Sequence, residues 1–373
     1  MKKSGKDVID LNVGEPDFET PRNICEAAIQ AINEGFTKYV TVNGILELRQ
    51  SICKKLKDDN GIEYWPENII VSTGAKQCLN NAVLTVCNEG DEIILPTPCW
   101  VSYEEIIRLS GAVPVFVKTD ERDGYQLNID NIKKALSPRT KGIMLNTPNN
   151  PTGAVYSRES LEALGRLAVE NDFLIFSDEI YEKLVYDDAV HVSIASLSDD
   201  IYQRTITING FSKAYAMTGW RIGYAAGPEK IIKAMSAIQG HMTHAANSIT
   251  QKAAIEALEG PQESLDIMRD EFEKRRNLLL GRLNQMNGVS CINSEGAFYL
   301  LPNVSKLYQK SYNGKTIKDS MDLANLLLEE GLVATVPGDA FESPDSIRLS
   351  YSNSYDKIEE AANRMDKIFK EIK

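Results

Sequence analysis

The sequence predicts an α/β fold, with a mostly parallel central sheet covered by helices on both faces and a smaller α+β domain beside it. Two observations favour this class. Short apolar runs alternate with amphipathic helical segments from about residue 69 to residue 210, as in parallel strands joined by crossover helices. After about residue 260 this alternation ends, and a long charged segment precedes shorter strand patterns.

Six apolar runs are expected to form buried strands of the large domain: 69–71, 92–95, 113–117, 142–145, 173–176 and 205–208. The segments between them have the spacing of helices that cover the sheet, at about 76–86, 101–109, 129–136 and 158–170. The sequence therefore predicts one large α/β domain over residues 41–262.

The C-terminal third predicts the smaller domain. Residues 262–283 have the pattern of one long charged helix, and strands are expected at 289–292, 297–301, 332–336 and 346–350. The last helix has an apolar stripe at helical spacing, formed by Ile358, Ala361, Ala362, Met365, Ile368 and Phe369. We expect residues 263–373 to form this domain, with residues 1–40 as its N-terminal part and a helix that begins near Pro21.

Composition argues against several classes of function. The 53 acidic residues exceed the 41 basic ones, and a net charge of −12 disfavours nucleic acid and anionic membrane surfaces as partners. No run of about 18 apolar residues predicts a membrane span, and the basic start at Met1 lacks the apolar run of a signal peptide. Six irregularly spaced cysteines favour reduced thiols in the cytoplasm. The pair His241 and His244 lacks nearby ligand residues, so no metal site is expected.

Candidate binding residues follow the predicted strands, at the sheet edge where α/β proteins bind ligands. Gly74, Ala75 and Lys76 open a helix, and their backbone N–H groups could bind a phosphate, although an ordinary helix start looks the same. Arg221 could add a second phosphate contact or be a surface arginine. Neither a P-loop nor a dinucleotide-binding glycine motif is present.

Other strand ends carry groups of different chemistry. Asp178 could hold a proton on a ring nitrogen or cap a turn, and Tyr181 could present its hydroxyl beside it or belong to the core. Asn150 could bind a phenolate oxygen or form part of a turn. Lys213 lies among small and aromatic residues, where burial makes an amine nucleophilic, although most lysines are solvated. Together with an aromatic face at Trp100, these groups describe a site for pyridoxal 5′-phosphate (PLP).

The motifs also resemble a known family. Asn149-Asn-Pro-Thr-Gly, Ser177-Asp-Glu-Ile-Tyr and Ser212-Lys-Ala-Tyr-Ala-Met-Thr-Gly-Trp-Arg-Ile-Gly are similar to those of class I/II, fold-type I PLP-dependent aminotransferases. The similarity runs from Leu11 to Tyr351 and is nearest to the bacterial aspartate aminotransferases, some of which also use prephenate.

This resemblance implies roles around the cofactor. Lys213 forms a Schiff base with PLP and moves the substrate proton, Asp178 pairs with the pyridine nitrogen, and Tyr181 with Asn150 binds the ring oxygen. Trp100 stacks on the ring, and both Trp100 and Asn150 border the substrate. The phosphate is surrounded by Gly74, Ala75, Lys76 and Arg221.

The same resemblance implies roles toward the substrate and a second subunit. Arg348 binds the substrate α-carboxylate, with Gly14 beside it, and Lys76 binds a distal carboxylate, which favours aspartate or glutamate with a 2-oxo acid. Tyr39 reaches the phosphate of the neighbouring subunit, which implies a homodimer with shared active sites.

Three departures from the family pattern bear on specificity. Only about a dozen residues precede the Val-Gly-Glu-Pro-Asp-Phe segment, Cys99 replaces a common tyrosine, and Gly210 replaces a serine that contacts the phosphate. A carbon–sulfur β-lyase and an aromatic aminotransferase therefore stay open as alternatives. A PLP-binding regulator without catalysis is the non-enzyme alternative; retention of Lys213 and Arg348 argues against it.

Overall fold

The computed structural model describes residues 5–373, so the prediction about the basic start at residues 1–4 lies outside the described residues. Within this range one sheet has seven strands, in the spatial order β2 (Ile69–Ser72), β8 (Gly223–Ala226), β7 (Thr205–Gly210), β6 (Leu174–Asp178), β5 (Thr140–Asn146), β3 (Glu92–Thr97) and β4 (Val113–Lys118). Only β8 runs antiparallel to its neighbours, which confirms the mostly parallel sheet. The sequence did not predict β8 because Gly-Tyr-Ala-Ala has no β-branched residue.

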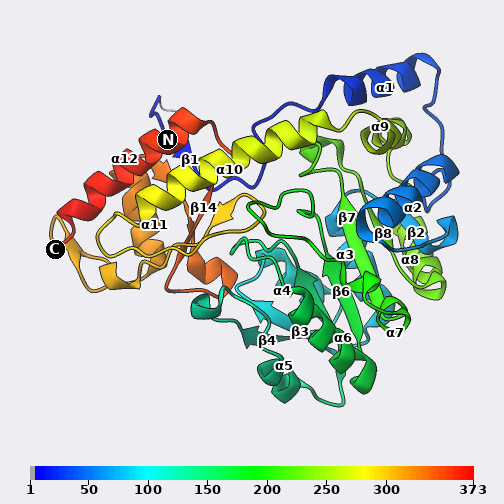
Figure 1. The fold of residues 1–373 in the computed structure, drawn as a ribbon, viewed down its shortest axis with the longest axis horizontal. Helices are drawn as coiled ribbons and strands as arrows, with labels where there is room; N and C mark the ends of the chain where they lie inside the picture. The colour runs from blue at the N-terminus through cyan, green and yellow to red at the C-terminus, as the bar shows by residue number, and fades with distance from the viewer. Residues whose placement is uncertain (1–4) are drawn as a thin grey trace.

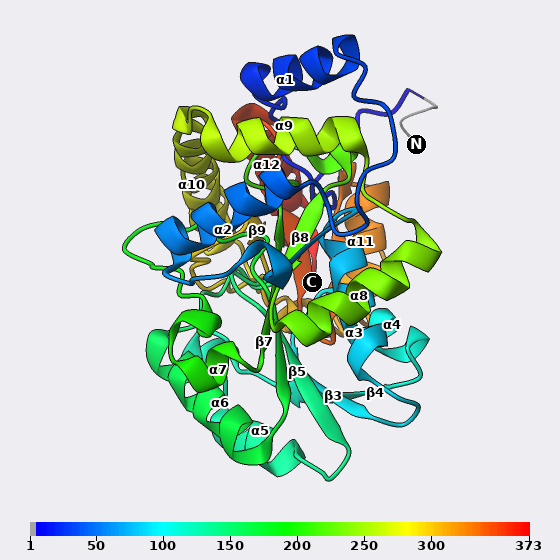
Figure 2. The same cartoon turned by 90° about the vertical axis from the view of Figure 1, so that its right-hand side faces the viewer.

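Helices cover both faces of this sheet, as predicted (Figures 1 and 2). One face packs against α3 (Ala75–Val86), α4 (Val101–Leu109) and α8 (Glu229–Met242). The other face packs against α5 (Ile129–Ala135), α6 (Arg158–Asn171) and α7 (Asp199–Tyr202). Successive strand residues point to opposite faces, so Ile143 joins the second layer while Met144 joins the first. This double burial explains why the strands are continuous apolar runs.

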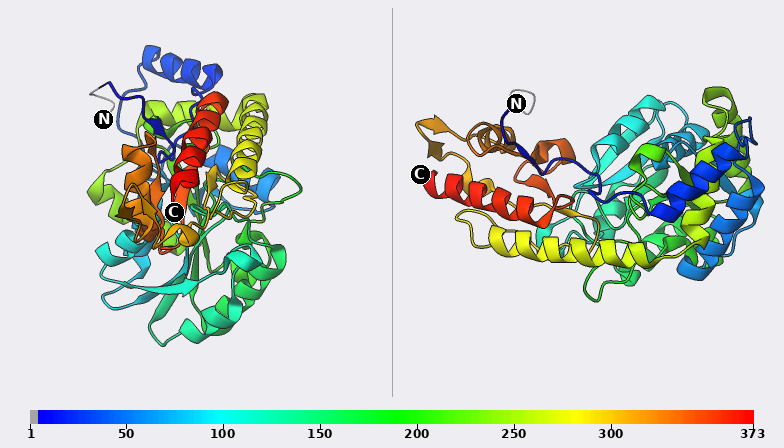
Figure 3. Two further views of the ribbon diagram at one scale, coloured as in Figure 1. Left: turned by 90° about the vertical axis from the view of Figure 1, so that its left-hand side faces the viewer. Right: turned by 90° about the horizontal axis from the view of Figure 1, so that it is seen from above.

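The C-terminal part contains α10 (Glu263–Leu283) and α12 (Tyr355–Glu371), which lie side by side (Figure 3). A three-stranded antiparallel sheet has the order β13 (Val336–Pro337), β14 (Ile347–Ser350) and β9 (Tyr299–Leu300). The remaining elements are α11 (Ser320–Glu329), the hairpin β10 (Ser311–Tyr312) and β11 (Lys315–Thr316), and β12 (Val333–Ala334), which pairs in parallel with β1 (Ile9–Asp10). The predicted apolar stripe of α12 is buried.

One strand prediction in this part was wrong, and another was confirmed only in part. Residues 289–292 form only an isolated bridge at Ser290, because the Asn284 side chain bonds both the N–H and the carbonyl of Cys291. A strand would need those backbone groups for its own pairing. Residues 332–336 divide into β12 and β13, and Leu332 itself has a left-handed φ of 54°. The side-chain pattern that predicted strands does not report either backbone feature.

The N-terminal residues contact both parts of the molecule. Strand β1 pairs with β12, but α1 (Arg22–Asn33) packs against α9 (Ser248–Glu259) and shares a core with α2 (Leu46–Asn60). We therefore propose that residues 41–262 and 263–373 form the two domains and that residues before 41 belong partly to each. No helix within the described residues is long and apolar enough to cross a membrane.

Candidate active site

A cavity of about 380 Å³ lies at the carboxyl ends of β5 and β6 and beside the first turn of α3. Ten of the residues predicted from the sequence line it: Gly14, Ala75, Lys76, Trp100, Asn150, Asp178, Tyr181, Lys213, Arg221 and Arg348. They come from five strand ends of the large sheet, from the N-terminal segment and from β14. The fold thus brings together residues that are up to 334 positions apart in the sequence, from Gly14 to Arg348.

Asp178, the last residue of β6, is held by its backbone and its side chain. Its carbonyl accepts hydrogen bonds from Asn146 Nδ2 at 3.0 Å and from the Thr147 N–H at 3.1 Å. Its carboxylate accepts from the Tyr103 hydroxyl at 2.8 Å and from the Ile180 N–H at 3.2 Å. Burial raises the pKa of Asp178 to about 6, although these two donors act in the opposite direction. The carboxylate is therefore suited to a cationic partner.

Lys213 lies in the loop after β7 and points into the same cavity. Its Nζ donates to the Gly14 carbonyl at 2.5 Å and lies 5.6 Å from the centre of the Phe298 ring. Burial lowers the pKa of Lys213 to about 8, while the nearby Glu15 carboxylate acts against this shift. An amine with a lowered pKa has a larger neutral, nucleophilic fraction near neutral pH.

An anion site is built at the start of α3. Gly74 caps the helix with a φ of 84° and, because it has no side chain, makes no side-chain hydrogen bond to the backbone N–H groups of the first turn. A Cβ atom at Gly74 would lie 2.6 Å from Arg221 Nη2, so the guanidinium approaches the helix start only because this residue is glycine. A helix N-terminus and an arginine together attract a phosphate.

Arg348 projects from β14 and keeps one donor free. Its two Nη atoms donate to Asn150 Oδ1 at 3.0 Å and to the Asn12 carbonyl at 2.8 Å, whereas its buried Nε has no partner within the described residues. The guanidinium stacks on Tyr299, with 4.5 Å between its central carbon and the ring centre. The Tyr299 hydroxyl in turn lies 2.9 Å from that of Tyr181. Bonding to Arg348 fixes the Asn150 oxygen and leaves its amide N–H₂ to donate.

Lys76 lies at the exposed rim of the cavity. Its Nζ is 4.6 Å from the centre of the Trp100 ring and donates to Ser102 Oγ at 3.1 Å. Cys99, next to Trp100, is buried at the end of the preceding loop.

Two of the predicted residues lie outside the cavity lining. Gly74 is the N-cap of α3 and leaves room for the Arg221 guanidinium at the anion site. Tyr39 is 93% exposed, packs edge to face on His244 at 5.1 Å, and borders a separate cleft.

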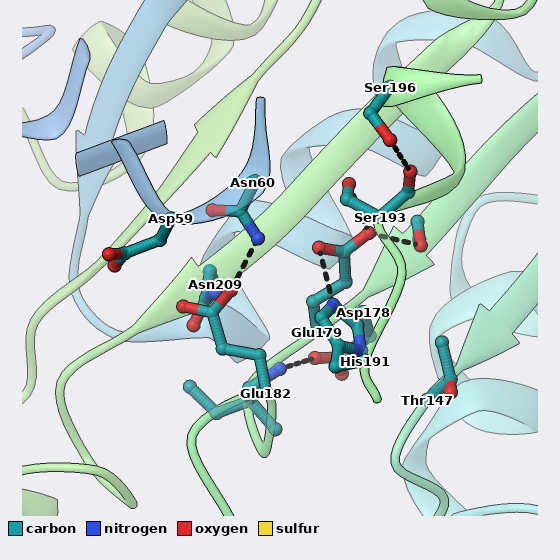
Figure 4. Close-up of polar contacts among 12 residues, drawn as sticks. Asp59, Asn60, Thr147, Asp178, Glu179, Glu182, His191, Ser193, Ser196 and Asn209 are labelled. Atoms are coloured by element: carbon teal, nitrogen blue, oxygen red, sulfur yellow. Dashed lines mark hydrogen bonds and ion pairs between the residues drawn. The ribbon is translucent and has the colours of Figure 1, made fainter. Parts of the chain in front are cut away.

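A polar cluster lies next to Asp178 and is formed by Glu179, Glu182, His191, Lys55 and Asn60. Figure 4 labels all of these residues except Lys55. His191 Nε2 is 3.1 Å from Glu179, which also accepts hydrogen bonds from two serines. Lys55 pairs with Glu182, and Asn60 Nδ2 donates to it at 2.8 Å. Ligand atoms of Glu179, Glu182 and His191 lie within 4.8 Å of one another, close enough for a metal ion, but the Lys55 ammonium already supplies a balancing positive charge.

Sequence reasoning missed several residues of the cavity. Tyr103 and Tyr299 lie within predicted helix and strand segments and were not among the predicted site residues, and Asn146 ends β5. Tyr103 follows Trp100 by three positions, the spacing of one helix face, which is a pattern that could have found it. Gly210 has no room for a side chain, because a Cβ atom there would lie 2.9 Å from Gly223 Cα. Ser212, two residues later, lines the cavity.

Known proteins match this chain over nearly its whole length. The model of the family "Aminotransferase class I and II" matches residues 6–365. An aspartate aminotransferase of Bacillus subtilis (strain 168) is 48% identical over 99% of this chain and 93% of its own. An aspartate/prephenate aminotransferase of Cereibacter sphaeroides is 46% identical over 98% of this chain and 92% of its own.

A solved structure shares the fold. The aspartate aminotransferase from Rhizobium meliloti superimposes with a TM-score of 0.97 at 40% identity, over 100% of this chain and 94% of its own. The family match, the identities and the fold agree with the resemblance inferred from the motifs. This chain therefore belongs to the class I and II aminotransferases, and it is an enzyme of the transaminase type.

Proposed function

We propose that the cavity binds PLP and that the enzyme transfers the amino group of aspartate or glutamate to a 2-oxo acid. One observation carries the proposal: the Lys213 amine, the Asp178 carboxylate and the anion site at Gly74 and Arg221 surround a single cavity. The names of the relatives support aspartate as a substrate.

The residues fit PLP in their chemistry. No lysine or arginine within the described part of the chain forms an ion pair with Asp178, so a protonated ring nitrogen would meet an available carboxylate. The uncapped first turn of α3 beside Arg221 suits a phosphate dianion. Trp100 offers an aromatic face at the same cavity.

Each residue then has a defined task. PLP, when bound, supplies an electron-withdrawing ring that stabilises negative charge at the substrate α-carbon. With PLP bound, Asp178 would keep the proton on the ring nitrogen. Lys213 would hold the cofactor until the substrate amine displaces it, and the freed Lys213 amine would then carry the proton of the substrate α-carbon. Asn150 and Tyr181 donate to the ring oxygen. Arg348 would bind the substrate α-carboxylate through N–H groups of its guanidinium, because this residue lines the cavity.

Lys76 supports the choice of a dicarboxylic substrate. Its ammonium is at the rim of the cavity, over Trp100, where it can meet a second carboxylate on the substrate side chain. An aromatic substrate would gain no charge interaction from this lysine, and the comparisons do not favour a carbon–sulfur β-lyase.

A homodimer completes the proposal. Tyr39 is almost fully exposed and does not line the cavity of its own chain, so it is free to donate to the phosphate bound by a second copy. Mixing Tyr39→Phe subunits with Lys213→Ala subunits tests this arrangement, since half of the hybrid dimers' sites would carry neither lesion. Recovery of activity on mixing is expected, and a monomer by sedimentation would contradict it.

The central experiment is reduction of the purified protein with borohydride in the presence of PLP. Peptide mapping should find the phosphopyridoxyl group on Lys213; an adduct on another lysine, or none, would refute the proposal. Single-turnover spectra with each amino acid then identify the donor. We expect aspartate or glutamate to react fastest, and a preference for phenylalanine or cysteine conjugates would replace the substrate assignment while keeping the enzyme class.

A further inference from the structure

We propose that Tyr103 is a positioning residue whose hydroxyl holds the Asp178 carboxylate in the orientation that receives the ring nitrogen of the cofactor. The inference rests on the proposed function, because it requires PLP in the cavity. It concerns a residue that neither the motifs nor the predicted site included.

The position of Tyr103 is fixed by its packing. It lies on α4, is 2% exposed, and contacts Trp100 edge to face with 5.3 Å between ring centres. Tyr103 lines the cavity beside Asp178, and its hydroxyl donates to Asp178 Oδ2 at 2.8 Å. Burial and the neighbouring Asp178 charge raise the pKa of Tyr103 well above its ordinary value, so the phenol stays protonated and remains a donor.

Tyr103 is the one side chain that donates to the Asp178 carboxylate within residues 5–373. The other oxygen receives only the backbone N–H of Ile180, at 3.2 Å. Of the charged groups nearby, Lys213 bonds the Gly14 carbonyl instead, and Glu179 is held in the polar cluster by His191 and two serines. Without the hydroxyl, the carboxylate would lose the donor that fixes its plane.

Loss of the Tyr103 hydroxyl would also change the pKa of Asp178. The Tyr103 hydrogen bond favours the ionised form of Asp178 and so opposes the effect of burial on its pKa. Removing it favours a protonated carboxyl group. A protonated Asp178 cannot stabilise a proton on the ring nitrogen, so binding of PLP should weaken, and more so as the pH falls.

The test is a double-mutant cycle on PLP affinity, measured by absorbance titration of the apoproteins between pH 6 and pH 8.5. Tyr103→Phe, which keeps the ring on Trp100, should raise the Kd for PLP on the order of tenfold at neutral pH, the lower end of what a hydrogen bond to a charged group contributes. The ratio of mutant to wild-type Kd should grow toward pH 6. In an Asp178→Asn background the same substitution should change the Kd less than twofold.

Tyr202→Phe is the matched control. It removes a tyrosine hydroxyl of the same part of the molecule, which donates to the Glu63 carbonyl at 3.2 Å away from the cavity, and PLP affinity should be unchanged. Thermal unfolding of each apoprotein checks that Tyr103→Phe folds normally.

The outcomes separate the inference from the function on which it rests. If wild-type protein binds PLP on Lys213 but Tyr103→Phe binds it equally well, the positioning role is overturned. The same holds if Tyr103→Phe costs as much affinity in the Asp178→Asn background as it does when Asp178 is present. If wild-type protein does not bind PLP at all, the proposed function itself fails and the inference falls with it.

Discussion

Asp178 and Glu182 are four residues apart at the carboxyl end of β6, and both carboxylates are buried, yet their surroundings have opposite effects. Burial raises the pKa of Asp178 to about 6, because the two neutral donors that it meets lower the pKa less than burial raises it. Burial also opposes ionisation of Glu182, but Lys55, His191 and Asn60 outweigh it and lower the pKa to about 2. Among the described residues, Asp178 thus forms no ion pair, whereas Glu182 is paired with Lys55.

The contrast between a paired and an unpaired buried carboxylate distinguishes residues that stabilise the fold from residues that bind a ligand. A buried charge with a lysine partner stabilises the folded state only as a pair, and removal of one partner is costly. A buried charge without a cation destabilises the apoprotein and gains free energy when a cationic ligand arrives.

Lys213→Ala should separate function from stability most strongly. Turnover should fall on the order of ten-thousandfold, because the substitution removes the amine that attaches the cofactor and carries the proton. The free energy of unfolding of the apoprotein should change by no more than about 1 kcal/mol. Steady-state kinetics and urea unfolding measure the two effects. Lys230→Ala, an exposed lysine, is the control, and substantial residual turnover in Lys213→Ala would contradict the assigned role.

Lys55→Met should lower the stability of the fold while leaving the attachment of PLP intact. It leaves Glu182 buried without its cation and should cost about 3–5 kcal/mol of unfolding free energy at pH 7. Because the folded pKa of Glu182 is lowered to about 2, the stability from this pair is present above the unfolded pKa near 4.3 and is lost as the pH falls toward 2.

Urea unfolding at several pH values tests this expectation. The deficit of Lys55→Met should shrink below about pH 4. The folded mutant should still attach PLP to Lys213, and exposed Lys54→Met should be neutral. A deficit that does not depend on pH would mean that packing, and not the ion pair, is lost.

Asp178→Asn should stabilise the apoprotein at neutral pH while crippling turnover. With a folded pKa near 6 and an ordinary value of 3.8, ionisation of Asp178 costs up to about 3 kcal/mol of stability above pH 6. That cost disappears as the pH falls from about 6 to about 4, so the gain from the Asp178→Asn substitution should disappear over the same range. Urea unfolding of both apoproteins at pH 4.5 and pH 8 measures it, with exposed Asp123→Asn as control. A gain of equal size at both pH values would argue against a charge effect.

Lys76→Ala should have the smallest effect, because this lysine is exposed and belongs to neither buried set. We expect the ratio of kcat/KM for aspartate over phenylalanine to fall roughly tenfold, about 1.4 kcal/mol, with stability unchanged. Lys76→Arg should keep most of the preference. An unchanged ratio in Lys76→Ala would remove the dicarboxylate argument but leave the transaminase assignment intact.

Much of the site could be predicted because its residues follow strands. Asp178, Lys213 and the start of α3 come directly after continuous apolar runs, and strand ends of a parallel sheet meet at one edge. Arg348 and Tyr39 were placed only by resemblance to the family, since their own surroundings in the sequence carry no comparable pattern. Tyr103 was missed because an aromatic residue on an amphipathic helix has the same pattern whether its hydroxyl meets a carboxylate or solvent.

Local sequence patterns were enough to predict the alternation of strands and helices, the buried stripe of α12 and the set of groups that describe a PLP site, because these depend on the period of apolar residues and on local motifs. The tertiary structure alone decided that β8 runs antiparallel inside the sheet, that α1 packs on α9, and that Cys291 loses its strand pairing to Asn284. It also decided which buried carboxylate meets a lysine. Asp178 and Glu182 lie in one short segment, but their partners come from α4 and α2, so only the packing of distant elements sets their charge.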